Sequence, residues 1–148
     1  MDKFKTKNKY LRVMKKVYVA GKLCDKEERE FLEKVAKVIE EEGFETFLPH
    51  REVGLARGIK DVQKIFEGDI TKGLNDCSLV IAVLNGLHVG AGTSWELGYA
   101  YAKGIPVIGI KTDEPIEEAI EYLSAIIIHS TEIVSSIEEL REKIKKLV

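Results

Sequence analysis

The chain has 148 residues, which is enough for one domain with a substantial hydrophobic core. Its 23 basic and 25 acidic residues leave a net charge of −2, so it lacks the basic surplus of a protein that coats nucleic acid. Cys24 and Cys77 are too far apart for a CxxC metal site or a disulfide framework, and without a signal peptide or a membrane span we expect a soluble cytoplasmic protein.

The N-terminal part predicts a leader, a strand and a helix. Residues 1–15 are mostly polar and basic, so we expect a loose leader. Residues 16–21 form an apolar run that ends in glycine, which is typical of a buried strand. Asp25, followed three residues later by Glu28, forms the pattern of a capping box, and the apolar spacing after it predicts a helix that stops at Gly43.

The next segment predicts a second strand over 44–48 and a loop over 51–60, where two glycines interrupt any periodicity. Asp61 then takes the N-cap position of a helix that we expect to end in a turn at Asp76. The wholly apolar run 79–84 follows, and its lack of alternation indicates a buried parallel strand.

The remaining elements continue the same alternation of strand and helix. In chain order they are a helix that carries Glu96 and stops at Gly104, a strand over 105–110, a helix over 115–123, a strand over 125–128 and a helix capped by Ser135 or Ser136. This order predicts a single doubly wound α/β domain over 16–148, flavodoxin-like or Rossmann-like, with a five-stranded parallel sheet.

The glycine-rich turn after the third strand is the most informative feature, because it places Glu96 at the opening of a helix. Open α/β sheets bind their ligands at this carboxyl edge. A glutamate in the first turn of a helix also complements the helix dipole, and that structural interpretation would prevail if Glu96 had no partners. Gly90, Gly92 and the amides of Thr93 and Ser94 could form a nest for a phosphate or a sugar hydroxyl.

Further candidates lie at the same edge of the predicted sheet. Tyr18 stands at the tip of the first strand and is followed by Gly21 and Lys22, where a ligand could approach the backbone and the amides could hold an anion. The segment is neither GxGxxG nor a Walker loop, which argues against a dinucleotide fold and a kinase. Tyr18 could equally be an aromatic packed on a neighbouring strand. For His50, after the second strand, a structural role and a place in the ligand pocket are equally open.

Asp69 is flanked by apolar positions of its expected helix, where a carboxylate needs a partner or a ligand. The three histidines, His50, His88 and His129, show no metal-ligand spacing. We therefore expect no metal, and nothing in the sequence implies a cofactor.

Tyr18, Asp69 and the Glu96-Leu-Gly-Tyr-Ala motif, in this order, resemble the nucleoside 2-deoxyribosyltransferase family over roughly residues 16–130. The resemblance implies a flavodoxin-like enzyme that cleaves the N-glycosidic bond of 2'-deoxynucleosides. It implies further that Glu96 is the nucleophile and forms a covalent deoxyribosyl-enzyme, that Tyr18 orients Glu96, and that Asp69 works beside the sugar and the base. An oxocarbenium-like transition state needs such an anionic nucleophile and a proton source for the departing base.

The departures from the family pattern concern the substrate. Transferases of the family usually carry an aspartate six residues before the nucleophile, where this chain has Gly90, and the 2'-deoxynucleoside 5'-monophosphate N-hydrolase branch also lacks it. Ser124, in a Leu-Ser-Ala segment, resembles the serine with which that branch reaches the phosphate bound in the partner subunit. The branch has an arginine after the first strand that this chain lacks, and Lys22, Lys26 or Arg29 could replace it as point charges.

These residues predict hydrolysis of a (2'-deoxy)nucleoside 5'-monophosphate, which gives free base and (deoxy)ribose 5-phosphate through a glycosyl-Glu96 intermediate. The alternatives are base exchange, in which a second base takes the sugar, and a nucleotide-binding module without turnover. As partners we expect a nucleoside or nucleotide substrate and a second copy of the chain in a dimer or a larger homo-oligomer, with no nucleic acid polymer and no membrane. The base, and ribose against 2-deoxyribose, stay open.

Overall fold

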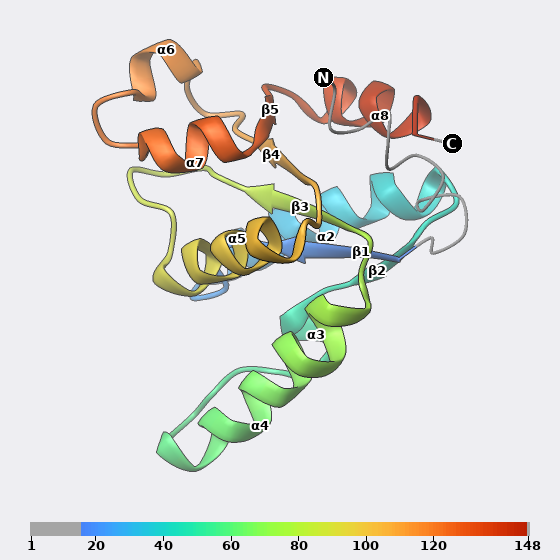
Figure 1. Cartoon of the computed structure of the whole chain (residues 1–148), viewed down its shortest axis with the longest axis vertical. Helices are drawn as coiled ribbons and strands as arrows, with labels where there is room; N and C mark the ends of the chain where they lie inside the picture. The colour runs from blue at the N-terminus through green and yellow to red at the C-terminus, as the bar shows by residue number, and fades with distance from the viewer. Residues whose placement is uncertain (1–15, 148) are drawn as a thin grey trace.

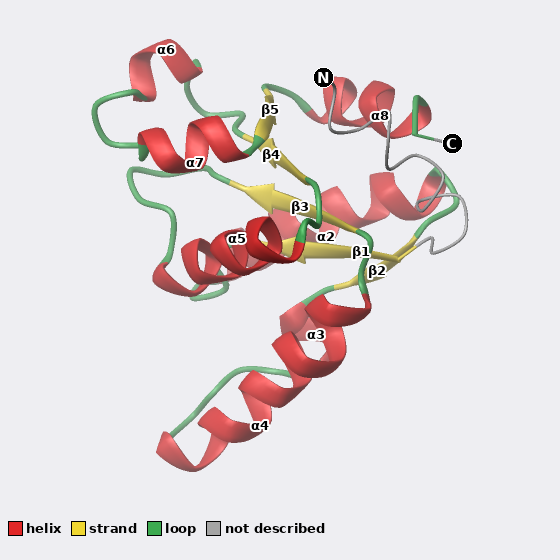
Figure 2. Ribbon diagram, in the orientation of Figure 1, coloured by secondary structure: helices red, strands yellow, loops and turns green. Residues whose placement is uncertain are grey.

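The computed structural model describes residues 16–147, and the leader expected over 1–15 lies outside the described residues. Five parallel strands form one sheet in the order β2-β1-β3-β4-β5. This flavodoxin-like order confirms the predicted fold class. Figures 1 and 2 show the sheet between its helices. The strands are β1 (Lys16–Ala20), β2 (Glu45–Phe47), β3 (Leu79–Val83), β4 (Val107–Ile110) and β5 (Glu132–Val134).

The helices cover both faces of the sheet, so that successive side chains of β1 enter two different cores (Figure 1). Val17 and Val19 pack with α2 and α8, whereas Tyr18 and Ala20 pack with α5 and the segment before β3. The helices are α2 (Lys26–Glu41), α3 (Pro49–Glu52), α4 (Val62–Phe66), α5 (Ala91–Lys103), α6 (Ile116–Ala119), α7 (Ala125–Ser130) and α8 (Ile137–Lys145). Within residues 16–147, no helix is long and apolar enough to span a membrane.

Helix termini follow the predicted signals in three places. Asp25 and Glu28 form both hydrogen bonds of the capping box at the start of α2. Gly104 ends α5 in the left-handed conformation, with φ of 72°. Ser136, and not Ser135, caps α8 by accepting a hydrogen bond from the amide of Glu139.

The region after β2 is more helical than predicted. Pro49 begins the short helix α3, because a proline is favourable at the first position of a helix. Asp61 takes the predicted N-cap position of α4, but its carboxylate accepts a hydrogen bond from the amide of Arg57 and forms no capping hydrogen bond with the helix. After α4 the helix widens into a π-helical segment, Glu67–Gly73, and ends in a tight turn at Asp76. Figure 1 shows α4 extending away from the sheet.

The predicted fifth strand over 125–128 is wrong, since these residues form α7, and β5 follows at Glu132–Val134. The hydroxyl of Ser124 accepts a hydrogen bond from the amide of Ile126 and caps this helix. An apolar run indicates an interior strand only where it is buried, and Ile126 is 79% exposed. The helix predicted over 115–123 is also shorter, because α6 ends at Ala119.

Candidate active site

Tyr18 is the third residue of β1 and is fully buried on the face that α5 covers. Its ring stacks on Phe47 of β2, with 5.5 Å between ring centroids and 11° between planes. Its hydroxyl forms no hydrogen bond of standard geometry among the described residues, and it lies beside the Glu96 carboxylate. Burial raises the pKa of Tyr18, and the nearby carboxylates of Glu96 and Asp69 raise it further, so the phenol stays protonated.

Glu96 is the sixth residue of α5, in its second turn, because the helix already begins at Ala91. The first-turn interpretation, in which Glu96 would complement the helix dipole, is therefore wrong. Its Oε2 atom is buried and has no hydrogen-bond partner among the described residues. Burial raises the pKa of Glu96 to about 7, the neighbouring Tyr18 hydroxyl opposes this shift, and the charge of Asp69 adds to it.

Asp69 lies in the π-helical segment and faces the same site. Its Oδ1 atom is buried without a hydrogen-bond partner among residues 16–147. Burial raises the pKa of Asp69 to about 6. Irregular π-helical turns are frequent at functional sites, because the extra residue in the turn redirects side chains. Periodicity could not have predicted the widened turn here.

The structure thus brings together Tyr18, Asp69 and Glu96 from three separate elements, and each leaves one polar atom buried and unpaired. Buried polar atoms without partners cost free energy, so their gathering at one place is typical of a site that a ligand completes. Carboxyl groups with pKa values near neutrality can serve as base, acid or nucleophile. The arrangement can therefore attack a carbon atom with one carboxylate and deliver a proton with the other.

Lys22 lies against the loop between β3 and α5. A Cβ atom at Gly90 would come within 3.0 Å of its Cγ, and one at Gly86 within 2.6 Å of its Nζ. Its ammonium group is 3.6 Å from the carboxylate of Glu28. At Gly21 the lack of a side chain serves packing and not the approach of a ligand, because a Cβ there would meet the Leu32 side chain at 2.7 Å.

The predicted anion nest is only partly available. The amide of Ser94 donates a hydrogen bond to the Gly90 carbonyl at 2.9 Å, so it belongs to the first turn of α5. Thr93 is buried, whereas Gly92 is exposed and has open space around it. Of the two amides predicted to hold an anion, the amide of Ser94 is therefore not available to a ligand.

His50 and Ser124 stand apart from the three central residues. His50 lies in α3 and is joined through Nε2 to Glu33 at 3.0 Å, while its Nδ1 is buried without a partner among the described residues. It lines a cavity of about 560 Å³ together with Arg29, Arg57 and Lys64. Ser124 is exposed at the start of α7. No hydrogen bond within residues 16–147 joins either one to Glu96.

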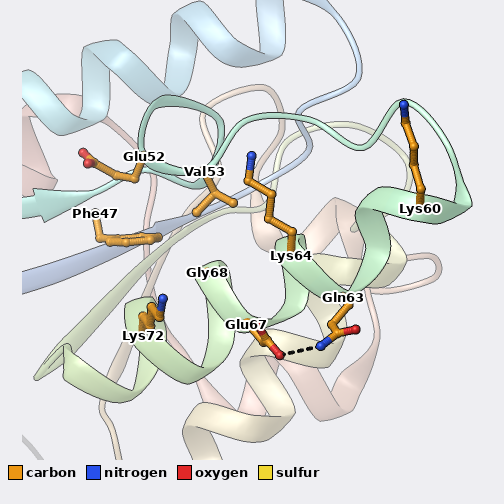
Figure 3. Close-up of a pocket in the computed structure, with 9 residues that line it drawn as sticks. All are labelled: Phe47, Glu52, Val53, Lys60, Gln63, Lys64, Glu67, Gly68 and Lys72. Atoms are coloured by element: carbon orange, nitrogen blue, oxygen red, sulfur yellow. Dashed lines mark hydrogen bonds between the residues drawn. The ribbon is translucent and has the colours of Figure 1, made fainter.

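A second cavity, of about 620 Å³, lies beside α4 and the π-helical segment (Figure 3). Gln63 and Glu67 are hydrogen-bonded at its rim, at 2.9 Å, and the sheet contributes the ring of Phe47. None of the residues that the sequence singled out lines this cavity. In the described part of the chain, no group of three histidine, cysteine or acidic side chains could hold a metal ion.

Sequence reasoning missed two features of the site. Phe47 supplies the surface on which Tyr18 stacks, and only the pairing of β1 with β2 places it there. Lys111 is buried at the end of β4, and a lysine directly after an apolar strand was the available signal.

The family model of nucleoside 2-deoxyribosyltransferase matches residues 17–133. The chain is similar to a solved conserved protein from Enterococcus faecalis, with 26% identity, a TM-score of 0.73, and 91% of this chain and 99% of the other covered. It shares its fold with a 2-deoxyribosyltransferase from Bacillus psychrosaccharolyticus, at 19% identity and a TM-score of 0.71, covering 85% and 90%. It also shares its fold with a CMP N-glycosidase from Clostridium botulinum, at 21% identity and a TM-score of 0.58, covering 87% and 97%. No curated protein matches the chain.

Proposed function

Because the chain belongs to the nucleoside 2-deoxyribosyltransferase family, and is thus an enzyme acting at N-glycosidic bonds, we propose that it hydrolyses (2'-deoxy)nucleoside 5'-monophosphates. The products are free base and (deoxy)ribose 5-phosphate. The observation that carries this proposal is the set of unpaired, buried polar atoms on Tyr18, Asp69 and Glu96. Family membership favours both enzymatic hypotheses over the binding module without turnover.

In the first step the Glu96 carboxylate attacks C1' of the sugar. The C1'–N bond breaks, its electron pair leaves with the base, and a proton from Asp69 neutralises the base. Burial raises the pKa of Asp69 to about 6, so its carboxyl group can carry a proton closer to neutral pH than an exposed aspartate can. The Tyr18 hydroxyl, which has no other partner among the described residues, is available to donate to Glu96 and hold it in position.

In the second step a water molecule attacks C1' of the glycosyl ester and gives its proton to the Asp69 carboxylate. The C1'–O bond breaks and Glu96 leaves as a carboxylate, so both side chains return to their starting states. Two moderate barriers replace one large barrier. In the alternative, base exchange, a second base takes the place of water.

The proposal also specifies which residues bind the 5'-phosphate of the substrate. Gly90 stands where transferases have an aspartate, and the side chain of Lys22 passes along this glycine. Lys22 thus places a cation next to the start of α5. We propose that it binds the 5'-phosphate together with Ser124 of a partner subunit. A lysine acts here as a point charge and lacks the planar fork of an arginine.

A second copy of the chain is also part of the proposal. Phe66, Trp95 and Tyr99 form one aromatic cluster, with centroid distances of 5.7 Å and 5.4 Å. Phe66 and Trp95 are each 50% exposed, and Tyr101 on α5 is 58% exposed. Exposed apolar groups gathered beside a site indicate a protein interface. We infer a homo-oligomer that covers this aromatic cluster.

A product assay tests the function. The purified protein is incubated with nucleosides and with their 5'-monophosphates, CMP included, each with and without a free acceptor base. Release of sugar phosphate without acceptor is the expected result, at a higher rate from monophosphates than from nucleosides. A new nucleoside that forms only with acceptor would establish base exchange instead. Equal turnover of nucleosides and monophosphates would overturn phosphate recognition.

A further inference from the structure

A fully buried lysine joins two loops at the carboxyl edge of the sheet. Lys111 follows β4 and is 1% exposed. Its Nζ donates to the carbonyls of Leu84, at 3.4 Å, and Gly86, at 3.2 Å, and lies 2.9 Å from Asp113. Removing an ammonium group from water is costly, and the cost is offset only when oxygens surround it, as they do here.

The same two loops are joined by further hydrogen bonds. The second carboxylate oxygen of Asp113 accepts from the amide of Gly86 at 2.7 Å. The Asn85 side chain donates to the Thr112 hydroxyl at 2.9 Å and accepts from the Thr112 amide at 2.8 Å. We call residues 84–86 and 111–113 the Lys111 network. The ammonium group also lies over the ring of Tyr122, 5.5 Å from its centroid.

The Lys111 network holds the loop that leads to Glu96. Residues 84–90 run from β3 to the start of α5, and Gly86 has a φ of +93°, which favours glycine. The space beside Gly86 is occupied by the ammonium group of Lys22. A displacement of Gly86 would therefore move the wall against which Lys22 lies and the start of the helix that carries Glu96.

We propose that Lys111 is a positioning residue of the active site, which fixes the loop 84–90 through its own hydrogen bonds and through Asp113. Replacing a buried ion pair by apolar side chains is often neutral or stabilising. A buried lysine is therefore not needed for stability as such, whereas its three oxygen partners define one position for the loop. The kinetic part of this proposal rests on the proposed function, and its structural part does not.

The test replaces Lys111 by methionine, which has a similar length and no charge. Hydrogen exchange is measured for residues 84–96, together with the emission of Trp95, the single tryptophan of the chain. We expect faster exchange confined to residues 84–96, a shifted Trp95 emission, and a loss of about tenfold or more in kcat with a smaller change in KM. Uniformly faster exchange across residues 16–147, or unchanged exchange in the loop, would overturn the proposal.

The matched control is Lys16→Met, which breaks the ion pair of Lys16 with Asp76, 3.1 Å long, at the amino end of β1. It should leave exchange at 84–96 and turnover unchanged. If Lys111→Met fails to fold, Asp113→Asn replaces it, since it removes the charge that pairs with Lys111 and keeps the size of the side chain. An unmodified protein that turns over none of the nucleotides would refute the proposed function, while hydrogen exchange would still decide the role of Lys111.

Discussion

At the scale of single residues, burial determines what Glu96 and Asp69 can do. Both carboxyl groups have raised pKa values, of about 7 and about 6, and burial is the largest cause of each shift. A surface carboxylate at neutral pH would be fully ionised and well solvated, and so a poorer nucleophile and no proton donor. Their raised pKa values therefore favour catalytic roles over a solvated helix face.

The raised pKa of Glu96 makes a prediction about stability. The folded protein binds this proton more tightly than the unfolded chain does. The stabilisation of the folded protein by this proton is therefore complete below pH 4.5, the ordinary pKa of a glutamate. It is lost as the pH rises through about 7, the pKa of Glu96 in the folded protein. Glu96→Gln stays neutral at every pH. The variant should match the unmodified protein near pH 4 and exceed its unfolding free energy above pH 7 by up to about 3 kcal/mol.

Thermal unfolding at pH 4, 5.5 and 7.5 measures this difference, with Glu117→Gln on the exposed side of α6 as the control. A difference between Glu96→Gln and the unmodified protein that does not change with pH would contradict the burial of Glu96. The same variant should lose turnover by about 10²-fold or more.

Removal of the Tyr18 hydroxyl should affect activity and stability differently. The hydroxyl is buried and unpaired among the described residues, so its removal in Tyr18→Phe also removes a desolvation cost. We expect unchanged or slightly higher stability together with a loss of about tenfold or more in kcat, because Glu96 loses the donor next to it. Chemical denaturation and steady-state kinetics on the same preparation check both parts. A variant that is both less stable and fully active would identify Tyr18 as a core residue only.

At the scale of elements, helix ends and the π-helical segment shape the site. The π-helical segment passes close to β2 and α3, because a Cβ at Gly73 would meet the Phe47 ring at 2.6 Å and one at Gly68 would meet Val53 at 2.7 Å. Gly73 thus permits the close approach of Phe47, on which Tyr18 stacks, and Gly68 permits that of Val53. The position of Asp69 thus depends on glycines that lie one residue before it and four residues after it.

Ser124, at the start of α7, has two roles that can be tested separately, one in capping the helix and one proposed in binding phosphate. Its hydroxyl caps α7, so Ser124→Ala should cost about 1 kcal/mol of stability, whatever else it does. If Ser124 also contacts phosphate in a partner subunit, the KM for a 5'-monophosphate should rise while turnover of a nucleoside stays the same.

The control for Ser124→Ala is Ser136→Ala, which removes the equivalent cap of α8. Both variants should lose similar stability, and only the first should change KM. Steady-state kinetics on a nucleoside and its monophosphate separates the two effects. Equal KM values for the two variants would leave Ser124 with its capping role alone.

At the scale of the whole molecule, the aromatic cluster of Phe66, Trp95 and Tyr99 is the apolar surface that a single chain leaves exposed to water. Phe66→Glu places a charge within this cluster and should convert the proposed homo-oligomer into monomers, since a buried unpaired charge is costly. Light scattering after size-exclusion chromatography measures the mass. Lys37→Glu, exposed on α2 on the opposite face of the sheet, should leave it unchanged. A monomeric unmodified protein would contradict the proposed homo-oligomer.

Local patterns in the sequence determined the alternation of strands and helices, the capping box of α2 and the run that carries Glu96. These signals depend on neighbours within a few residues, so the chain carries them without reference to its fold. The same patterns misassigned residues 125–128, because an apolar run does not reveal whether it is buried or exposed.

Only the tertiary structure decided the environment of the candidate site. The burial of Glu96, the stacking of Phe47 on Tyr18 and the contacts of Lys111 with the loop before α5 join residues from different elements. Burial and desolvation are properties of the assembled fold, and no local pattern reports them. The sequence therefore predicted which side chains would carry the proposed chemistry, whereas packing decided their pKa values and their partners, because both depend on the exclusion of water.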